Sequence, residues 1–132
     1  MTSLFTPVDL NNHPYTLKST TSSQEWCGHT YTQFNLDGGN YRFKQFSYFE
    51  SEGDEDKKVD VALFEEELMT RIRLNQGILP EGEIDLIPST LHARFAHQNI
   101  RPTKAQISKK QSEASTISVS YTHLTLPTTP YV

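Results

Sequence analysis

Polar and apolar residues alternate along much of the first half of the chain, which predicts antiparallel β-structure. Residues 15–21 place Tyr15, Leu17 and Ser19 on one face and β-branched or charged side chains on the other. Residues 29–35 and 41–49 are rich in Thr, Tyr and Phe, which strands favour. The Asp-Gly step between these two segments supplies the positive-φ position of a tight turn. We therefore predict a strand followed by a β-hairpin.

The aromatic side chains change face within the second strand of this hairpin. Tyr41 and Phe43 share one face, whereas Phe46 and Tyr48 lie on the other. Either both faces of the sheet are covered, or a bulge at residues 44–45 shifts the register. The sequence leaves both alternatives open.

A three- and four-residue apolar spacing predicts one amphipathic helix, over about residues 60–75. Its glutamates and arginines fall largely outside the apolar stripe, which is expected to pack on the sheet. Asp60 is the expected N-cap, and Gly77 the residue that ends the helix. The stripe consists of Val61, Phe64, Leu68 and Ile72.

Three shorter segments complete the predicted elements. Residues 84–87 form a short apolar strand before Pro88, residues 91–97 alternate as another, and residues 104–107 form a last one. The predicted fold class is therefore α+β, a mainly antiparallel β-sheet with one helix packed on it.

The charge balance argues against a nucleic-acid surface. The chain has 12 basic and 16 acidic residues and a formal net charge of -4, whereas phosphate binding needs clustered Lys and Arg. The densest charge cluster is acidic, at residues 50–56, and lacks the ligand spacing of a calcium loop. We expect it to be a solvated loop before the helix.

The densest chemical cluster surrounds Cys27 and His29. A thiol two residues from an imidazole suggests a Cys/His nucleophile pair, although such pairs normally come from distant positions. The alternative is structural, with Trp26 and Cys27 buried at the entry to a strand. We predict the structural role. The alternative is an enzyme that uses the Cys27/His29 pair.

Metal and cofactor sites are not predicted. Cys27, His29, His92 and His97 match no zinc-ligand spacing. The sequence also has no phosphate loop, dinucleotide fingerprint or nucleophile elbow.

The last residues of the chain resemble a translated sequencing adapter. Residues 119–124 match one frame of a library-kit transposase end, and residues 125–128 match the rest of that adapter. A sample index fits residues 129–131, and the adapter bases that follow it encode Val132 and a stop. We predict that residues 118–132 are an artefact and that residues 1–117 are a fragment of a single β-rich domain.

Several blocks resemble, in order, a family of poorly characterised bacterial lipoproteins often labelled septum formation inhibitor Maf. They are residues 23–29 (Ser-Gln-Glu-Trp-Cys-Gly-His), 47–52 (Ser-Tyr-Phe-Glu-Ser-Glu), 63–74 and 87–89. The resemblance covers about residues 5–104. It implies a cell-envelope parent, periplasmic or in the outer membrane, with an export signal and a lipid anchor that this chain does not carry. Membrane attachment is expected only through that anchor.

The label itself points to an enzyme that the residues do not support. True Maf proteins are nucleotide pyrophosphatases with a Ser-x-Ser-Pro-Arg-Arg block, whereas the Arg-Pro step of this chain is Arg101-Pro102. We therefore expect no nucleotide hydrolysis. The predicted function is a non-enzymatic binding or structural domain.

Overall fold

The computed structural model describes residues 1–75 and 77–109, so the predictions for residues 118–132 lie outside the described residues. Two short helices and a 3-10 turn accompany a larger amount of strand. The elements in chain order are β1 (Thr2–Phe5), β2 (Lys18–Glu25), β3 (Gly28–Asp37), β4 (Asn40–Ser47), β5 (Glu55–Asp60), β6 (Leu63–Phe64), η1 (Glu65–Glu67), α1 (Leu68–Leu74), β7 (Gly82–Ile87), α2 (Thr90–Phe95) and β8 (Thr103–Ile107).

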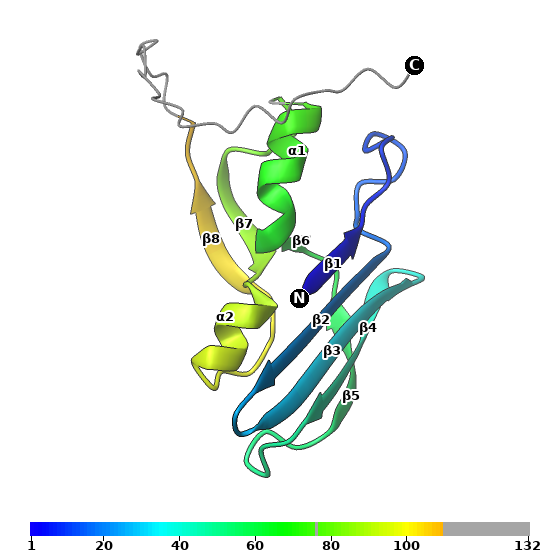
Figure 1. Cartoon of the computed structure of the whole chain (residues 1–132). Coiled ribbons are helices and arrows are strands. Elements are labelled where there is room, and N and C mark those ends of the chain that lie inside the picture. The colour runs from blue at the N-terminus through cyan, green and yellow to red at the C-terminus, as the bar shows by residue number, and fades with distance from the viewer. Residues whose placement is uncertain (76, 110–132) are drawn as a thin grey trace, which may run out of the picture.

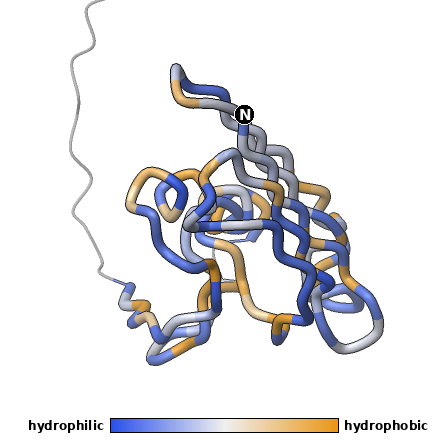
Figure 2. The backbone as a smooth tube through the Cα atoms, turned by 90° about the horizontal axis from the view of Figure 1, so that it is seen from below, coloured by the Kyte–Doolittle hydropathy of each residue, from blue (hydrophilic) through white to orange (hydrophobic). Residues whose placement is uncertain are grey.

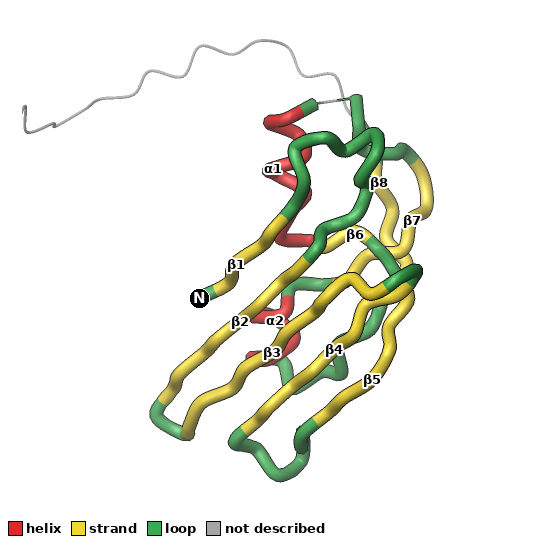
Figure 3. Tube along the Cα trace, turned by 90° about the vertical axis from the view of Figure 1, so that its right-hand side faces the viewer, coloured by secondary structure: helices red, strands yellow, loops and turns green. Residues whose placement is uncertain are grey.

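The strands form two sheets. The larger has the order β1-β2-β3-β4-β5, in which every neighbouring pair is antiparallel and consecutive in the chain (Figure 3). The smaller has the order β6-β7-β8, with β6 parallel to β7 and β8 antiparallel to it. Both helices and the smaller sheet lie on one side of the larger sheet (Figure 1). The α+β class with mainly antiparallel strands is confirmed.

The predicted hairpin is confirmed as β3 and β4. Their register runs without interruption from Asp37 opposite Asn40 to Thr30 opposite Ser47. Of the two turn glycines only Gly38 has a positive φ, +64°, as expected for a type II′ turn. There is no bulge in this pair, so Phe46 points to the outer face of the sheet and stays half exposed.

The inner face of the large sheet has an apolar half and a polar half. Hydrophobic and hydrophilic segments are interspersed along the backbone (Figure 2), and buried positions alternate with less buried ones in β3 and in the first half of β4, as expected for strands with one inward-facing set of side chains. Phe34, Phe43 and Tyr41 are fully buried and pack against Phe64 of β6. The ring centroids of Phe34 and Phe64 lie 5.1 Å apart. Each such side chain contributes about 1.5–3 kcal/mol by burial, so these aromatic residues join the two sheets.

The helix predicted over residues 60–75 is wrong in its first half. Asp60 is the last residue of β5 and not an N-cap, and Phe64 reaches the core from strand β6. Residues 55–60 alternate between half-buried and exposed positions and pair with β4, and this period of two outweighs the helical spacing. The helix itself is α1, which ends at Leu74 with Asn75 as its C-cap.

The surface that α1 buries also differs from the prediction. Ile72 of the predicted stripe is exposed, whereas Arg71 is buried. Arg71 Nε lies 3.1 Å from Glu67 Oε1, and Arg71 Nη2 donates to the carbonyl oxygen of Pro14 at 2.6 Å. Thr16 donates to the other Glu67 oxygen. Glu67 and Arg71 therefore form a buried ion pair, and the hydrogen bonds that both residues make with the β1–β2 loop attach the helix to that loop.

The strand predicted over residues 91–97 is also wrong, because this segment forms α2. Ser89 caps the helix by accepting from the backbone N–H of His92. At the other end His97 has φ +52°, and its N–H and that of Gln98 bond back to Arg94 and Ala93. This is a Schellman motif with histidine where glycine is usual, so the common stop signal of a helix is absent from the sequence.

Candidate functional site

Polar side chains occupy the half of the inner sheet face that α2 covers. Thr21, Thr32 and Gln45 form one cross-strand row, and Ser23, Thr30 and Ser47 form the next. The strands alternate their side chains between faces, so these six residues point toward the side on which α2 packs.

Two glutamates of η1 fix the first turn of α2 against this face. Glu65 accepts from the N–H of Ser89, and Glu66 accepts from the N–H and the hydroxyl of Thr90, all within 3.1 Å. Thr90 in turn shares a hydrogen bond with Thr21 of β2. These contacts satisfy amides that a helix N-terminus leaves unpaired, and they set which α2 side chains face the sheet.

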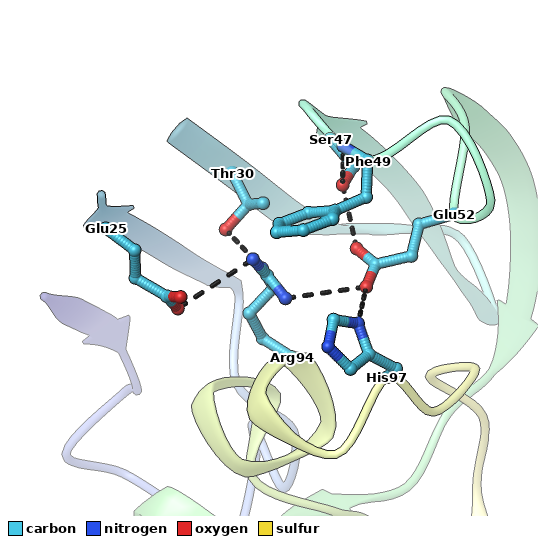
Figure 4. A network of polar contacts seen from close by, with 7 residues as sticks. All are labelled: Glu25, Thr30, Ser47, Phe49, Glu52, Arg94 and His97. Carbon is cyan, nitrogen blue, oxygen red and sulfur yellow. Dashed lines mark hydrogen bonds and ion pairs between the residues drawn. The ribbon is translucent and has the colours of Figure 1, made fainter. Parts of the chain in front are cut away.

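Arg94 is the buried charge at the centre of the site (Figure 4). Its Nε donates to the hydroxyl of Thr30 at 3.1 Å, and its Nη1 lies 3.4 Å from Glu52 Oε1. A second carboxylate, Glu25, is 3.8 Å from Nη2. The guanidinium also lies over the ring of Phe49, 4.2 Å from its centroid. A buried charge needs such partners, because removal from water is costly.

Glu52 connects Arg94 to His97 and Ser47. His97 Nδ1 is 2.7 Å from Glu52 Oε1, and the Ser47 hydroxyl donates to Oε2 at 2.7 Å. Burial alone would raise the pKa of Glu52, but the hydrogen bonds from Ser47 and His97 and the charge of Arg94 outweigh it. The pKa therefore lies below its ordinary value. Ser47 donates to a carboxylate and not to an imidazole, so it is not arranged as an activated nucleophile.

A cavity of about 140 Å³ lies beside this cluster, between the polar rows and α2. Thr32 lines it, and the Thr32 hydroxyl is buried without a hydrogen-bond partner among the described residues. Buried polar atoms are nearly always paired, so this hydroxyl has free capacity for a bound molecule. The lining residues are Thr30, Thr32, Gln45, Ser51, Glu52, Ala93, Arg94, His97, Gln98, Asn99 and Ile100.

The predicted site residues Cys27 and His29 both lie exposed at the end of the sheet where β2 turns into β3. Trp26 and Cys27 are exposed in the β2–β3 turn, so the prediction that they are buried is wrong. Two turn residues between paired strands have no inward-facing position, which explains the difference. His29 Nε2 lies 2.8 Å from the Ser22 hydroxyl. Nucleophilic use of Cys27 with His29 stays the alternative that the sequence left open.

The histidines considered for metal binding lie in different surroundings. His97 joins the Glu52 cluster, whereas His92 lies on the exposed side of α2. Within residues 1–75 and 77–109, no group of three or more His, Cys, Asp or Glu side chains is arranged to hold a metal ion. The described helices also include none long and apolar enough to cross a bilayer.

The sequence missed Arg94 and Glu52. Glu52 lies in the acidic run that was expected to be solvated before a helix, yet the run leads into β5 and Glu52 turns inward. The available signal was Ser89 followed by Thr90, an N-cap pattern that predicts a helix. A helix beginning there places Ala93 and Arg94 together on its buried side.

Comparison with known proteins identifies no relative of this chain. No family model, curated protein or solved structure matches the chain.

Proposed function

We propose that the chain is a non-enzymatic binding domain whose cavity between the polar rows and α2 holds a small polar molecule. The observation that carries the proposal is the unpaired, buried hydroxyl of Thr32 in the cavity wall. A convergent set of polar groups around a partly apolar hollow is the usual form of a ligand site.

The walls favour a neutral ligand. Arg94 and Glu52 of the cavity wall already pair with each other, so neither is left as a counterion for a charged ligand. The amides of Gln45, Gln98 and Asn99 offer donors and acceptors, and the side chains of Ala93 and Ile100 are apolar. The cavity volume of about 140 Å³ is near the roughly 150 Å³ of an engineered cavity that admits benzene. The expected ligand is therefore a small amide or alcohol.

Titration with small amides and alcohols tests this function. Acetamide, N-methylacetamide, 2-pyrrolidinone and glycerol would be added while backbone amide NMR signals are recorded. We expect shifts confined to the cavity, around Thr32, Gln45 and Gln98, and weaker binding in Thr32→Val. Thr20→Val, on the outer face of β2, is the matched control. Absence of any localised shift, or equal binding by Thr32→Val, would contradict the proposal.

We further propose that this domain belongs to a longer lipoprotein of the bacterial cell envelope. The support is the resemblance of residues 23–29, 47–52 and 63–74 to that family. Fatty-acid labelling and cell fractionation of the full-length parent test this proposal, and a parent found only in the soluble cytoplasmic fraction would contradict it.

A further inference from the structure

Aromatic side chains gather on the outer face of the large sheet, opposite the face that α2 covers. Tyr31 and Phe46 lie directly across from each other on β3 and β4, and Tyr48 follows two residues after Phe46. Phe46 is 51% exposed and Tyr48 is 70% exposed. Exposed apolar patches on folded proteins commonly mark interaction sites.

These side chains line a hollow of about 410 Å³ that is separate from the cavity beside Arg94. Asp54, from the loop before β5, contributes a carboxylate to the same hollow. We call Tyr31, Phe46, Tyr48 and Asp54 the outer aromatic cluster. The remaining lining residues are His29 and Ser47.

Tyr48 is held in place although it is exposed. A Cβ atom on Gly28 would lie 2.2 Å from Tyr48 Cγ, so the ring can rest there only because residue 28 is glycine. The N–H of Tyr48 also donates to the carbonyl oxygen of His29 at 3.2 Å. Tyr31 is oriented by its hydroxyl, which donates to Gln33 Oε1 at 2.9 Å. The aromatic surface is therefore preorganised, which lowers the entropic cost of binding.

The charge of the hollow is negative. Asp54 makes no hydrogen bond or ion pair with the rest of the described chain, and it is exposed. Lys44 and Arg42, the two cations that β4 places on the outer face, both pair with Asp56, at 3.7 and 3.1 Å. The carboxylate of Asp54 is thus available to a ligand.

We propose that the outer aromatic cluster binds a small organic cation of the methylated-ammonium class. Ring faces carry negative potential, so several of them around one hollow attract a cation, and quaternary ammonium groups are recognised in this way. Asp54 adds a full negative charge on the same side. A methylated ammonium is weakly hydrated, so its methyl groups also gain from contact with the rings.

An anionic ligand is excluded by the same features. Single-stranded nucleic acid stacks its bases on exposed aromatic residues, but it also needs a basic groove for its phosphates. Here the unpaired charge in the hollow is Asp54, which repels phosphate.

The test compares choline with 3,3-dimethylbutan-1-ol, its neutral isostere, using the full chain. We expect choline, in the millimolar range, to shift the NMR signals of residues 29–31 and 46–48, and the isostere to bind much more weakly. Tyr48→Ala and Asp54→Asn should each lower choline affinity by about fivefold or more. Phe95→Ala, an exposed aromatic residue on α2, is the control and should leave affinity unchanged.

Two outcomes would overturn the proposal. Equal binding of choline and its isostere would show an apolar patch without cation recognition. Unchanged affinity in Asp54→Asn together with Tyr48→Ala would place the binding elsewhere, and this readout does not depend on core stability because both residues are exposed. Co-sedimentation with phosphatidylcholine vesicles, lost in Asp54→Asn, would identify a lipid headgroup as the source of the cation.

Discussion

Thr30 and Thr32 lie two residues apart on the inner face of β3, but their hydroxyls have different surroundings. The hydroxyl of Thr30 accepts from Arg94 Nε at 3.1 Å. The hydroxyl of Thr32 is buried with no partner among the described residues. The first hydroxyl therefore contributes to the stability of the fold, whereas the second forms no hydrogen bond within the described residues.

Replacing each threonine by valine should therefore shift stability in opposite directions. Thr30→Val leaves Arg94 Nε unpaired and should lower the free energy of unfolding by about 1–3 kcal/mol. Thr32→Val removes an unpaired buried hydroxyl and should raise it by up to about 1 kcal/mol. Urea denaturation of both variants measures the difference. Shifts of the same sign and size would show that the two hydroxyls are not distinguished in this way.

The lowered pKa of Glu52 predicts a pH-dependent contribution. The folded protein favours the carboxylate, so the stabilisation is present above the unfolded pKa of about 4.5 and is lost as pH falls through the lower, folded pKa. Glu52→Gln should cost about 2 kcal/mol at neutral pH, since Arg94 then keeps only Glu25. The difference from the natural chain should shrink below about pH 4. Urea denaturation at pH 7, 4 and 3 checks this, and a difference independent of pH would contradict it.

At the scale of elements, α2 depends on residues outside itself. It is six residues long, too short to be stable in isolation. Its first turn is held by Glu65 and Glu66 of η1, which lie more than twenty positions earlier in the chain. The two glutamates act here as distant caps of another helix.

Glu66→Ala should destabilise the protein by about 1–3 kcal/mol, because the N–H of Thr90 loses its acceptor in a half-buried place. Glu50→Ala is the matched control. Glu50 is an exposed glutamate, and its replacement should change stability by less than about 0.5 kcal/mol. Thermal and urea denaturation measure both. Equal effects would show that Glu66 is only a surface charge.

The hairpin of β3 and β4 could be predicted from the sequence because a two-residue Gly turn and regular alternation are local signals. The start of the segment 60–75 and the end of the helix within 91–97 could not, since long-range contacts and an unusual C-terminal residue determine them. Residues 55–60 become a strand by pairing with β4, and the positive-φ residue that follows α2 is His97 where glycine is usual. The candidate site was missed for the same reason. Of its buried charges, Glu52 resembled a surface acid and Arg94 belonged to a segment assigned to a strand.

At the scale of the whole molecule, the Glu67–Arg71 pair attaches α1 to the loop between β1 and β2. Both side chains are almost fully buried. Tyr41 of β4 reaches the same loop by donating to the carbonyl oxygen of Thr16 at 2.8 Å. Burial, with the nearby charge of Glu67, raises the pKa of Tyr41, so this donor stays protonated.

Arg71→Met should destabilise the fold by about 3–5 kcal/mol, because it leaves the buried carboxylate of Glu67 without a counterion. The double variant Glu67→Gln with Arg71→Met should recover part of that loss, and the resulting cycle should give a coupling energy above about 1 kcal/mol. Arg73→Met is the control, since Arg73 lies exposed on the same helix. A coupling energy near zero would show that the two charges act independently.

The division of the inner sheet face into an apolar and a polar half has a consequence for local motion. The half under α2 is held mainly by hydrogen bonds to Thr21 and Thr30 and by the Arg94 ion pairs, whereas the aromatic half buries rings that join both sheets. Of the α2 side chains, only that of Ala93 belongs to the buried core cluster, so separation of α2 from the sheet leaves the rings of the aromatic half packed. Amide protons of α2 are expected to exchange with solvent through this partial opening, and those of β3 and β4 only through global unfolding. Such an opening would give a molecule access to the cavity beside Arg94 while the rest of the chain remains folded.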